Sequence, residues 1–463
     1  MFTRRVAVIG AGYVGASTAA CLASLGHLVT CADINEDKVA RLNRAEVSIN
    51  EPGLSGLIAE GLAAGRLRFV VDAGVAVHSA DVVYLCLPTP MGTGGVADLT
   101  VLESVLLGLR EVLPANCIVA IKSTVPVGTA ARSRDLLGRA DVAVVSNPEF
   151  LREGSAVHDV LNPDRIVVGS DQQDAAERVG ALYTRLGAPT VLTDAASAEL
   201  IKYAANCFLA TKLSYVNAIA ELCERLGADV RDVTEGMGYD RRIGQAFLSP
   251  GPGWGGSCLP KDSHALLQIA DGVDFEFRLL RAAIDTNTRQ FRRITNKIRL
   301  ALTGCRQGSL RDVRLCLFGL TFKAGTDDLR DSPALAVATQ LRQAGAVLVA
   351  HDPAIRSDAT HPALADLTTV DDPMIAAKGA EAVVVLTDWP QFRGLDWTSL
   401  ADALHRPIMV DTRNLLDPDT ITRAGLHYHG LGTRPVPPGT GVSEHSAVST
   451  GPHHGLGTVT PCC

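Results

Sequence analysis

The chain is 463 residues long, which is more than one hydrophobic core usually serves and suggests about three domains. Its 47% hydrophobic and 20% charged residues are typical of a soluble globular protein. A formal net charge of -7, and the lack of any run of about 18 apolar residues, give no reason to expect nucleic acid or a membrane as a partner.

Residues 1–195 alternate apolar strand segments with helical segments, which is the pattern of a doubly wound parallel sheet in an α/β domain. The expected strands are RVAVIG, LVTCAD, DVVYLCLP, CIVAIKST, VAVVSNPEF, RIVVGS and PTVLT, in chain order.

The first expected strand runs directly into Gly10-Ala11-Gly12-Tyr13-Val14-Gly15. In a dinucleotide site, Gly10 would make the tight turn, Gly12 would let the main chain approach a pyrophosphate, and Gly15 would let helix pack on strand. Asp33 ends the next strand, where a carboxylate accepts a hydrogen bond from a ribose hydroxyl and repels a 2′-phosphate. The pattern therefore predicts NAD rather than NADP, against the alternative of a purely structural glycine turn.

Strand patterns stop over residues 196–302, where helices are expected from Ser197 to Leu226 and from Asp274 toward Leu302. Lys202 and Asn206 are four residues apart and share one face of the first helix. A pair at a catalytic site and an ordinary lysine reaching solvent beside a satisfied asparagine both fit this spacing.

The glycine-rich segment GPGWGGSCLPKD, residues 251–262, leads into another expected helix. Pro260 suits the first turn of that helix, which places Cys258 just outside the helix N-terminus and beside Lys261. Both features would lower the pKa of the thiol and make it a nucleophile for an aldehyde, although an inert buried cysteine is the alternative. Asp262 is either a general base or a carboxylate that complements the helix dipole.

A second α/β unit is expected over residues 303–432, without a glycine fingerprint. Its expected strands are VRLCLFGL, AVLVAHD, AVVVLTDW and, as the last, PIMVDTRN, with a helix over SPALAVATQLRQAG. The segment FKAGTDDLRDSP follows the first of these strands, where Lys323 and Arg330 could bind phosphate or carboxylate. A solvated charge run is the alternative.

Residues 433–463 are rich in Gly, Pro, Ser, Thr and His, and we expect them to be a disordered tail. Its terminal Cys462 and Cys463 only superficially resemble a prenylation signal. The eleven cysteines of the chain are scattered, without zinc spacing, so we expect reduced thiols in the cytoplasm and no metal site.

Taken together, these motifs resemble those of the UDP-glucose/GDP-mannose dehydrogenase family. The matching segments, in order, are GAGYVG, EPGL, PTP, STVPVGT, NPEFLREG, IKYAANCF, DRRIGQAFLSPGPGWGGSCLPKD and FKAGTDDLRDSP. The resemblance implies an α/β fold with an N-terminal Rossmann NAD-binding domain (1–195), a central long-helix dimerisation domain with the cysteine loop (196–302) and a C-terminal Rossmann-like nucleotide-sugar-binding domain (303–432).

The resemblance also implies an activity, because the family oxidises the C6 alcohol of a nucleotide sugar twice, with NAD, to the uronic acid. Cys258 would carry the thiohemiacetal and the thioester, and Lys202 would stabilise the oxyanion. Asp262 and Lys202 would assist proton transfer, while Glu149 would help to hydrolyse the thioester. The catalytic set implied in this way is Cys258, Lys202, Asn206, Asp262, Glu149 and Thr124.

Binding residues are implied position by position. Those matching NAD contacts of the family are Gly10, Gly12, Tyr13, Val14, Gly15, Asp33, Lys38, Thr89, Thr124, Glu153, Lys261 and Arg330. Those matching substrate contacts are Glu149, Phe150, Leu151, Glu153, Lys202, Asn206, Arg242, Phe247, Leu248, Ser249, Pro250, Gly251, Gly255, Cys258, Phe322 and Lys323. Arg242 would reach the site of a neighbouring subunit, in a homodimer built on the long central helix.

The segment DRRIG at 240–244 resembles UDP-glucose members, so we expect UDP-glucose as substrate and UDP-glucuronate as product. Leu259, which GDP-mannose members also carry, keeps GDP-mannose open, and a UDP-N-acetylhexosamine is a further alternative. Some relatives place an arginine near the end of the last strand, where this chain has Arg413 and Asn414. A single-hydride β-hydroxyacid dehydrogenase and a non-catalytic NAD-binding regulator are rivals from other functional classes.

Overall fold

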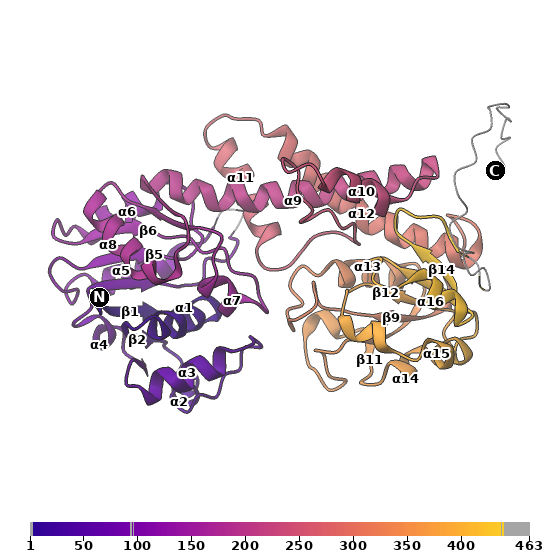
Figure 1. Cartoon of the computed structure of the whole chain (residues 1–463), viewed down its shortest axis with the longest axis horizontal. Helices are drawn as coiled ribbons and strands as arrows, with labels where there is room; N and C mark the ends of the chain where they lie inside the picture. Colours follow the sequence, from indigo (N-terminus) through magenta and orange to yellow (C-terminus); the bar gives the residue numbers. More distant parts are fainter. Residues whose placement is uncertain (1–2, 93–94, 96, 437, 439–463) are drawn as a thin grey trace.

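The computed structural model describes residues 3–92, 95, 97–436 and 438. Two sheets lie side by side, and the long helix α9 (Ala195–Leu226) runs across both of them (Figure 1). Within the described part of the chain, no helix combines the length and the apolar composition needed to cross a membrane.

The first sheet has eight strands in the order β3-β2-β1-β4-β5-β6-β7-β8. Their bounds are β1 (Arg5–Ile9), β2 (Leu28–Ala32), β3 (Leu67–Val70), β4 (Val82–Leu85), β5 (Ile118–Ile121), β6 (Ala143–Ser146), β7 (Ile166–Gly169) and β8 (Thr190–Thr193). All seven expected strands are present, whereas β3 was not expected.

The expectation of a sheet that is parallel throughout is wrong at one point. Strands β6 and β7 pair antiparallel, through Ser146 and Gly169, and β8 then pairs parallel with β7. A buried apolar strand has the same residue pattern in either direction, so the sequence does not reveal this reversal.

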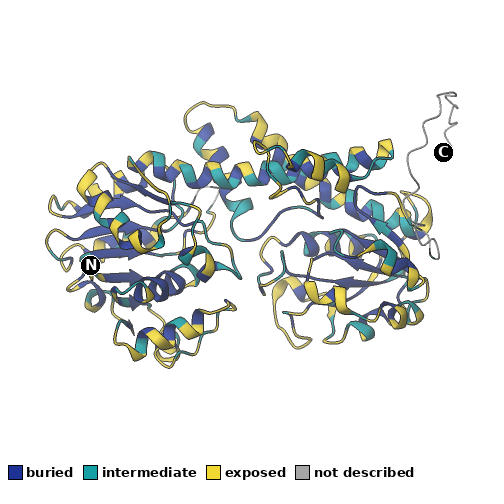
Figure 2. Cartoon of the chain, in the orientation of Figure 1, coloured by how far each residue is buried: buried dark blue, intermediate teal, exposed yellow. Residues whose placement is uncertain are grey.

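Helices cover both faces of the first sheet because successive strand residues point to opposite sides. Val6 and Val8 pack with α1 (Tyr13–Ser24), α3 (Leu54–Ala63) and α7 (Ala156–Leu161). Ala7 and Ile9 pack with the helices of the other face, which are α4 (Ala73–Val77), α5 (Thr100–Leu109) and α6 (Thr129–Leu137). Helices α2 (Glu36–Leu42) and α8 (Gln173–Gly180) complete this part, whose strands are largely buried except for the exposed edge strand β8 (Figure 2).

The central helices lie close to the predicted bounds. Asp194 caps α9 by accepting a hydrogen bond from the Ser197 N–H at 2.8 Å, and Gly227 ends the helix with a φ of +74°. Helices α11 (Leu259–Asp271) and α12 (Arg278–Thr303) both pack against α9, and α10 (Val230–Gly238) follows it.

The second sheet has six parallel strands in the order β11-β10-β9-β12-β13-β14. They are β9 (Arg314–Phe318), β10 (Val347–His351), β11 (Thr368–Thr369), β12 (Ala382–Val385), β13 (Ile408–Asp411) and β14 (His427–Gly430). The prediction that β13 is the last strand is wrong, because β14 has the polar sequence HYHG and pairs at the sheet edge. Its helices are α13 (Pro333–Gln343), α14 (Pro373–Ala377), α15 (Trp397–Ala403) and α16 (Pro418–Arg423).

The expected start of the disordered tail at residue 433 is also wrong. Thr433 is buried, and Val436 pairs antiparallel with Tyr428. Residue 437 and residues 439–463, with Cys462 and Cys463, lie outside the described residues. The domain boundaries drawn from the sequence stay a prediction.

Candidate active site

The glycine turn after β1 is shaped by its contacts with neighbouring backbone. Gly10 has a φ of +96°, and a Cβ there would lie 2.5 Å from the Cys86 carbonyl oxygen. A Cβ on Gly15 would lie 1.8 Å from the Gly10 oxygen. At Gly12, by contrast, a Cβ would meet nothing within 4 Å. Gly10 and Gly15 are thus required by the protein, whereas Gly12 faces open space into which a pyrophosphate fits.

Asp33 presents a fixed carboxylate beside this turn. Its Oδ2 accepts hydrogen bonds from the Ala11 N–H at 2.9 Å and from Lys38 Nζ at 2.8 Å. Burial raises the pKa of Asp33, but the bonds from Lys38, Asn35 and Ala11 outweigh it and hold the pKa below its usual value. The carboxylate therefore stays ionised and suits a ribose hydroxyl, as the NAD prediction requires.

A cavity of about 370 Å³ lies between the glycine turn and the loop after β9. Tyr13 and Glu153 line one side of it, and Asp328 and Arg330 the other. Arg330 donates to Asp328 Oδ1 at 2.9 Å and to Glu153 Oε1 at 3.2 Å. This cavity adjoins the glycine turn and holds the Arg330 guanidinium, so we take it as the candidate dinucleotide cavity.

Hydrogen bonds connect the loop after β4 to the loop after β5, at the carboxyl ends of these strands. The Thr89 hydroxyl donates to the Thr124 carbonyl oxygen at 2.8 Å, and the Ser123 hydroxyl donates to the Leu87 carbonyl oxygen at 2.7 Å. Thr124 therefore lies at the carboxyl ends of the strands, where α/β sheets bind ligands.

Helix α9 presents three polar side chains at positions i, i+3 and i+7, which share one face. Glu199, the first, is buried and accepts hydrogen bonds from the Gly128 N–H at 2.6 Å and the Ala130 N–H at 2.7 Å. It thereby caps α6 and holds the loop that carries Thr124.

Lys202, the second, forms a buried ion pair with Glu149. Its Nζ lies 3.0 Å from Glu149 Oε1 and donates to the Glu149 carbonyl oxygen at 2.7 Å. Burial opposes both charges, but the attraction between them outweighs it. The pKa of Lys202 is therefore above its usual value and the pKa of Glu149 is below its usual value. Since Lys202 is only 3% exposed, the alternative of a lysine that reaches solvent is wrong.

Asn206, the third, donates to Asp262 Oδ2 at 2.6 Å. Lys261 Nζ donates to Asp262 Oδ1 at 2.6 Å, so this lysine is engaged with the carboxylate rather than with the thiol. Asp262 is 1% exposed, which favours a role within the site over that of a surface carboxylate at the start of a helix.

Cys258 is the N-cap residue of α11, as expected. Its Sγ lies 3.5 Å from the Ser257 hydroxyl, which donates to Glu153 Oε1 at 3.1 Å. The prediction that the pKa of Cys258 is lowered is wrong, because burial raises it and Lys202 only partly compensates against the charges of Glu149 and Asp262. The thiol is therefore mainly protonated at neutral pH and needs a proton acceptor when it reacts.

The glycines before Cys258 are crowded by protein. A Cβ would lie 2.5 Å from the Phe291 ring at Gly253, 1.9 Å from the Asp331 oxygen at Gly255 and 2.7 Å from the Phe322 ring at Gly256. The run therefore packs the cysteine loop against α12, through Gly253, and against the loop after β9, through Gly255 and Gly256.

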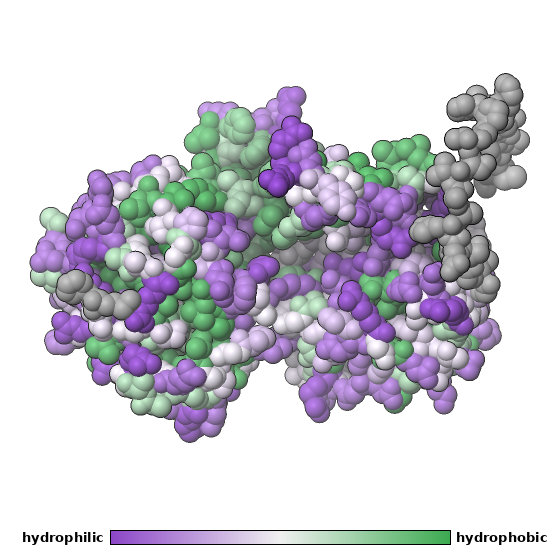
Figure 3. Space-filling view, in the orientation of Figure 1, coloured by the Kyte–Doolittle hydropathy of each residue, from purple (hydrophilic) through white to green (hydrophobic). Residues whose placement is uncertain are grey.

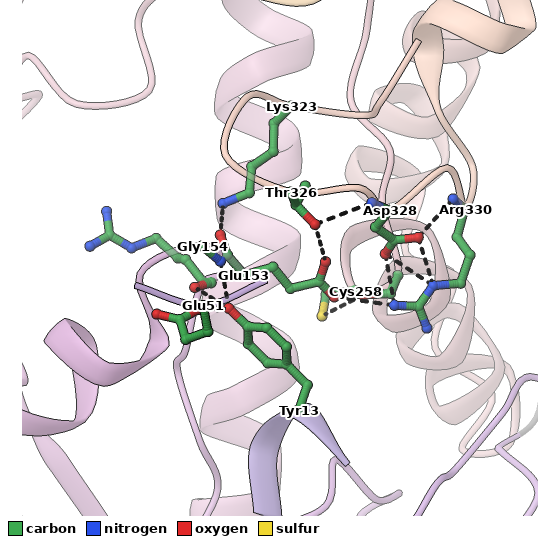
Figure 4. Close-up of polar contacts among 11 residues, drawn as sticks. Tyr13, Glu51, Glu153, Gly154, Cys258, Lys323, Thr326, Asp328 and Arg330 are labelled. Carbon is green, nitrogen blue, oxygen red and sulfur yellow. Dashed lines mark hydrogen bonds and ion pairs between the residues drawn. The ribbon is translucent and has the colours of Figure 1, made fainter. Parts of the chain in front are cut away.

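That second loop is not a solvated charge run, so the alternative interpretation of residues 322–333 is wrong. Lys323 donates to the Glu153 carbonyl oxygen, and Thr326 is buried (Figure 4). Arg413, whose contact the sequence left open, donates to the Leu386 oxygen at 2.9 Å and the Phe322 oxygen at 3.3 Å. It thus supports the base of this loop.

Other predicted residues fall into two groups. Phe150 lies close to the ion pair, with Lys202 Nζ 5.4 Å from its ring centroid, and the Leu151 N–H donates to Glu149 Oε2 at 2.6 Å. Within the described residues of this chain, Arg242 bonds only with Asp240 and its side chain is 89% exposed, so it is not brought to Cys258. Of the other residues predicted to contact the substrate on this segment, Phe247 and Ser249 are exposed, whereas Leu248, Pro250 and Gly251 are buried.

Three residues of the site were not singled out from the sequence. Glu199 could have been found, because it lies three residues before Lys202 on the same helical face. Ser257 is adjacent to Cys258, and Glu51 belongs to the quoted EPGL segment but had no assigned role. No group of three or more His, Cys, Asp or Glu side chains that could hold a metal is found among the residues that the structure describes.

Comparison with known proteins gives consistent matches along the chain. Residues 4–187 match the NAD binding domain of the UDP-glucose/GDP-mannose dehydrogenase family, residues 196–289 its central domain and residues 316–418 its UDP binding domain. UDP-glucose 6-dehydrogenase TuaD of Bacillus subtilis is 40% identical over 446 residues, which are 95% of either chain.

Two solved structures are also similar. A UDP-glucose dehydrogenase from the archaeon Pyrobaculum islandicum has a TM-score of 0.83 and 35% identity, covering 94% of this chain and 98% of that one. A UDP-D-ManNAc dehydrogenase from Pyrococcus horikoshii has a TM-score of 0.81 and 28% identity, covering 92% and 99%.

We predict a pH-dependent contribution of Glu199 to stability. Burial raises its pKa to about 7, against the Ala130 and Gly128 hydrogen bonds and with help from Asp171 and Asp194. The folded state therefore binds this proton more tightly than the unfolded chain, and the resulting stabilisation is lost as pH rises from about 5 through about 7. Between those values the urea midpoint of the wild type should fall relative to that of Glu199→Gln. Parallel profiles would contradict this, and the exposed Glu177→Gln serves as control.

We also predict slow alkylation of Cys258 at neutral pH, with a rate that rises into the alkaline range because its pKa is raised. The charge of Lys202 lowers the pKa of this thiol, so Lys202→Met should raise that pKa. At a given pH, iodoacetamide should then label Cys258 several-fold more slowly in the variant than in the wild type, about tenfold for each unit by which the pKa rises. Peptide mass mapping follows Cys258 and, as an internal control, the exposed Cys305. Equal rates for the two cysteines at neutral pH would refute this electrostatic account.

Proposed function

Because the chain belongs to the UDP-glucose/GDP-mannose dehydrogenase family, we propose that it oxidises UDP-glucose at C6 to UDP-glucuronate through covalent intermediates on Cys258. Family membership confirms the resemblance found in the sequence, the α/β architecture and the NAD cofactor. One observation carries the covalent mechanism. Lys202, Glu149 and Asp262 all act electrostatically on the Cys258 thiol, whose neighbour Ser257 donates to Glu153 beside the candidate dinucleotide cavity, and whose loop packs on the loop after β9.

The first oxidation converts the C6 alcohol to an aldehyde. When bound, NAD accepts one hydride from C6 in each of the two oxidations. The hydroxyl proton leaves to a neighbouring base, and Asp262 is placed for this because Asn206 and Lys261 fix both of its oxygens. The ammonium of Lys202 stabilises negative charge on the substrate oxygen.

Cys258 then adds to the aldehyde carbon. A bond forms between sulfur and carbon, the thiol proton is transferred, and the carbonyl oxygen becomes the hydroxyl of a thiohemiacetal. Because the thiol is protonated, its proton must leave as the bond forms, and ionised Glu149 is proposed to accept it and pass it to the carbonyl oxygen, which leaves Glu149 ionised again. Loss of a second hydride and of the hydroxyl proton gives the thioester.

Hydrolysis completes the reaction. Water adds to the thioester carbon, the carbon–sulfur bond breaks, and Cys258 leaves as the thiol while the acid is released. Glu149 is suited to take a proton from this water, because Lys202 and the Leu151 N–H keep it ionised. The loop after β5, which carries Thr124 and is anchored by Glu199, lies at the same end of the first sheet as Glu149.

The nucleotide sugar is proposed to lie between the segment 247–251 and the loop after β9, with Lys323 as its cation. UDP-glucose is favoured because the 40% identical relative is a UDP-glucose 6-dehydrogenase. The UDP-D-ManNAc dehydrogenase among similar structures keeps a UDP-N-acetylhexosamine as the second candidate. We also propose a cytoplasmic location, because all nine cysteines among the described residues are free.

We propose that the molecule is a homodimer built on α9. This helix exposes an apolar stripe at intervals of about two turns, formed by Leu200, Phe208, Tyr215 and Leu222. Phe208 is the most exposed residue of the stripe, at 68%, and contact of this large aromatic surface with water is unfavourable unless a partner covers it. Further apolar surface lies where α11 passes into α12, with exposed Val273 and Phe275, at the top of Figure 3.

The reaction predicts two NADH formed for each UDP-glucose consumed, with UDP-glucuronate as the only sugar product. Cys258→Ser should abolish acid formation, because the serine oxygen cannot form the thioester. Absorbance at the NADH maximum and chromatography of the nucleotide sugars measure both quantities. One NADH with release of an aldehyde would rule out the covalent route. Faster turnover of GDP-mannose or a UDP-N-acetylhexosamine would instead overturn only the substrate.

The exposed Arg242 predicts a site that is shared between subunits. Arg242→Ala and Cys258→Ser should each be inactive, yet dissociated and reassembled mixtures should regain about a quarter of wild-type activity, because half of the dimers then hold one complete site. A mixture of either variant with itself is the control. No recovery in a mixture shown to contain heterodimers would place Arg242 outside the partner's site.

A further inference from the structure

The peptide group between Glu153 and Gly154 is held at both ends by side chains from different parts of the fold. Lys323 Nζ, on the loop after β9, donates to its carbonyl oxygen. The Tyr13 hydroxyl, from the NAD-binding glycine turn, accepts from its N–H. Figure 4 shows both side chains converging on this one peptide.

A third side chain extends this arrangement. The Tyr13 hydroxyl donates to Glu51 Oε2, while Glu51 Oε1 accepts from the Val157 N–H at 3.2 Å at the start of α7. Burial, together with Glu51, raises the pKa of Tyr13, so the phenol stays protonated and donates. Glu51 is itself buried and belongs to the EPGL segment, to which no function has yet been assigned.

All the hydrogen bonds in this chain of groups point the same way. They run from the Lys323 ammonium through the peptide and the Tyr13 hydroxyl to the Glu51 carboxylate. Such a series is cooperative, because each bond polarises the next, and a cation at one end and an anion at the other reinforce it.

The backbone leaves little freedom for this peptide to move independently. Gly154 has a φ of +79°, and a Cβ there would lie 2.5 Å from the Gly325 carbonyl oxygen. The loop after β6 is therefore pressed against the loop after β9, so a shift of one loop must displace the other.

We propose that the Glu153–Gly154 peptide couples the NAD site to the nucleotide-sugar site, and that Glu51 is the positioning residue that sets this coupling through Tyr13. The proposal rests on the proposed function for the identity of the two ligands. Tyr13 lines the dinucleotide cavity and Lys323 is among the substrate residues, so each ligand acts on one end of the same hydrogen-bonded series. By linkage, each ligand must then change the affinity of the other by the same factor.

NADH fluorescence titrations of the full-length protein test this. UDP-glucose cannot be oxidised while NADH occupies the site, so the ternary complex is stable during the measurement. We expect saturating UDP-glucose to change the Kd of NADH in the wild type by about fivefold or more. Tyr13→Phe, which removes the acceptor for the Gly154 N–H, should bring this ratio close to one, and Glu51→Gln should reduce it by removing the terminal charge.

The ratio of the two Kd values separates coupling from simple contact with NADH. Glu46→Gln, an exposed carboxylate paired with Arg44 and five residues from Glu51, should retain the wild-type ratio. A wild-type ratio of one, or variants that weaken NADH equally with and without UDP-glucose, would overturn the proposal. Thermal denaturation verifies that Glu51→Gln folds, and Tyr13→Phe tests the same series from its other member.

Failure of the proposed function gives a different result. If UDP-glucose is not oxidised but another nucleotide sugar is, the titration is made with that sugar, and the ratio still decides whether the sites are coupled.

Discussion

The buried ion pair between Lys202 and Glu149 joins the central helix to the first sheet, and the arrangement of the site depends on it. Removing two charges from water is costly, and their attraction compensates only when further hydrogen bonds satisfy both groups. Here the Glu149 carbonyl and the Leu151 N–H supply them. Breaking the pair by removing one partner would leave a charge uncompensated in a dry interior. The pair also sets the protonation of its surroundings, since both charges act on the Cys258 thiol.

Helix α9 supplies this lysine together with two further anchors. Glu199 holds the loop after β5, and Asn206 holds Asp262 on α11. Because these positions lie on one face of a single helix of 32 residues, two separate loops and the first turn of α11 share one rigid support. Helical periodicity thereby places the groups proposed to react, while the cysteine loop itself is fixed by packing of its glycines against α12 and the loop after β9.

The sequence predicted the two sheets, the long helix and the family because these depend on local patterns. Seven of the eight strands in the first sheet are apolar runs between turn signals, whereas β3, β11 and β14 are short edge strands with polar residues and were missed. The reversal at β7 depends on the path of the chain rather than on composition. The pKa of Cys258 was mispredicted for a related reason. The helix end and Lys261 are visible in the sequence, but burial and the carboxylates of Glu149 and Asp262 are brought together only by tertiary packing.

A protonated thiol changes what the site must provide. If Cys258 were a permanent thiolate, it would have to be stabilised by Lys202, whose charge would then be partly neutralised before the substrate oxygen needs it. A neutral thiol leaves the Lys202 ammonium paired with Glu149, and proton loss from sulfur can be coupled to formation of the carbon–sulfur bond. Burial disfavours a thiolate but does not disfavour a neutral thiol. If the thiol loses its proton only as the carbon–sulfur bond forms, no free thiolate has to exist in the dry pocket, so burial of the thiol is compatible with its proposed reactivity.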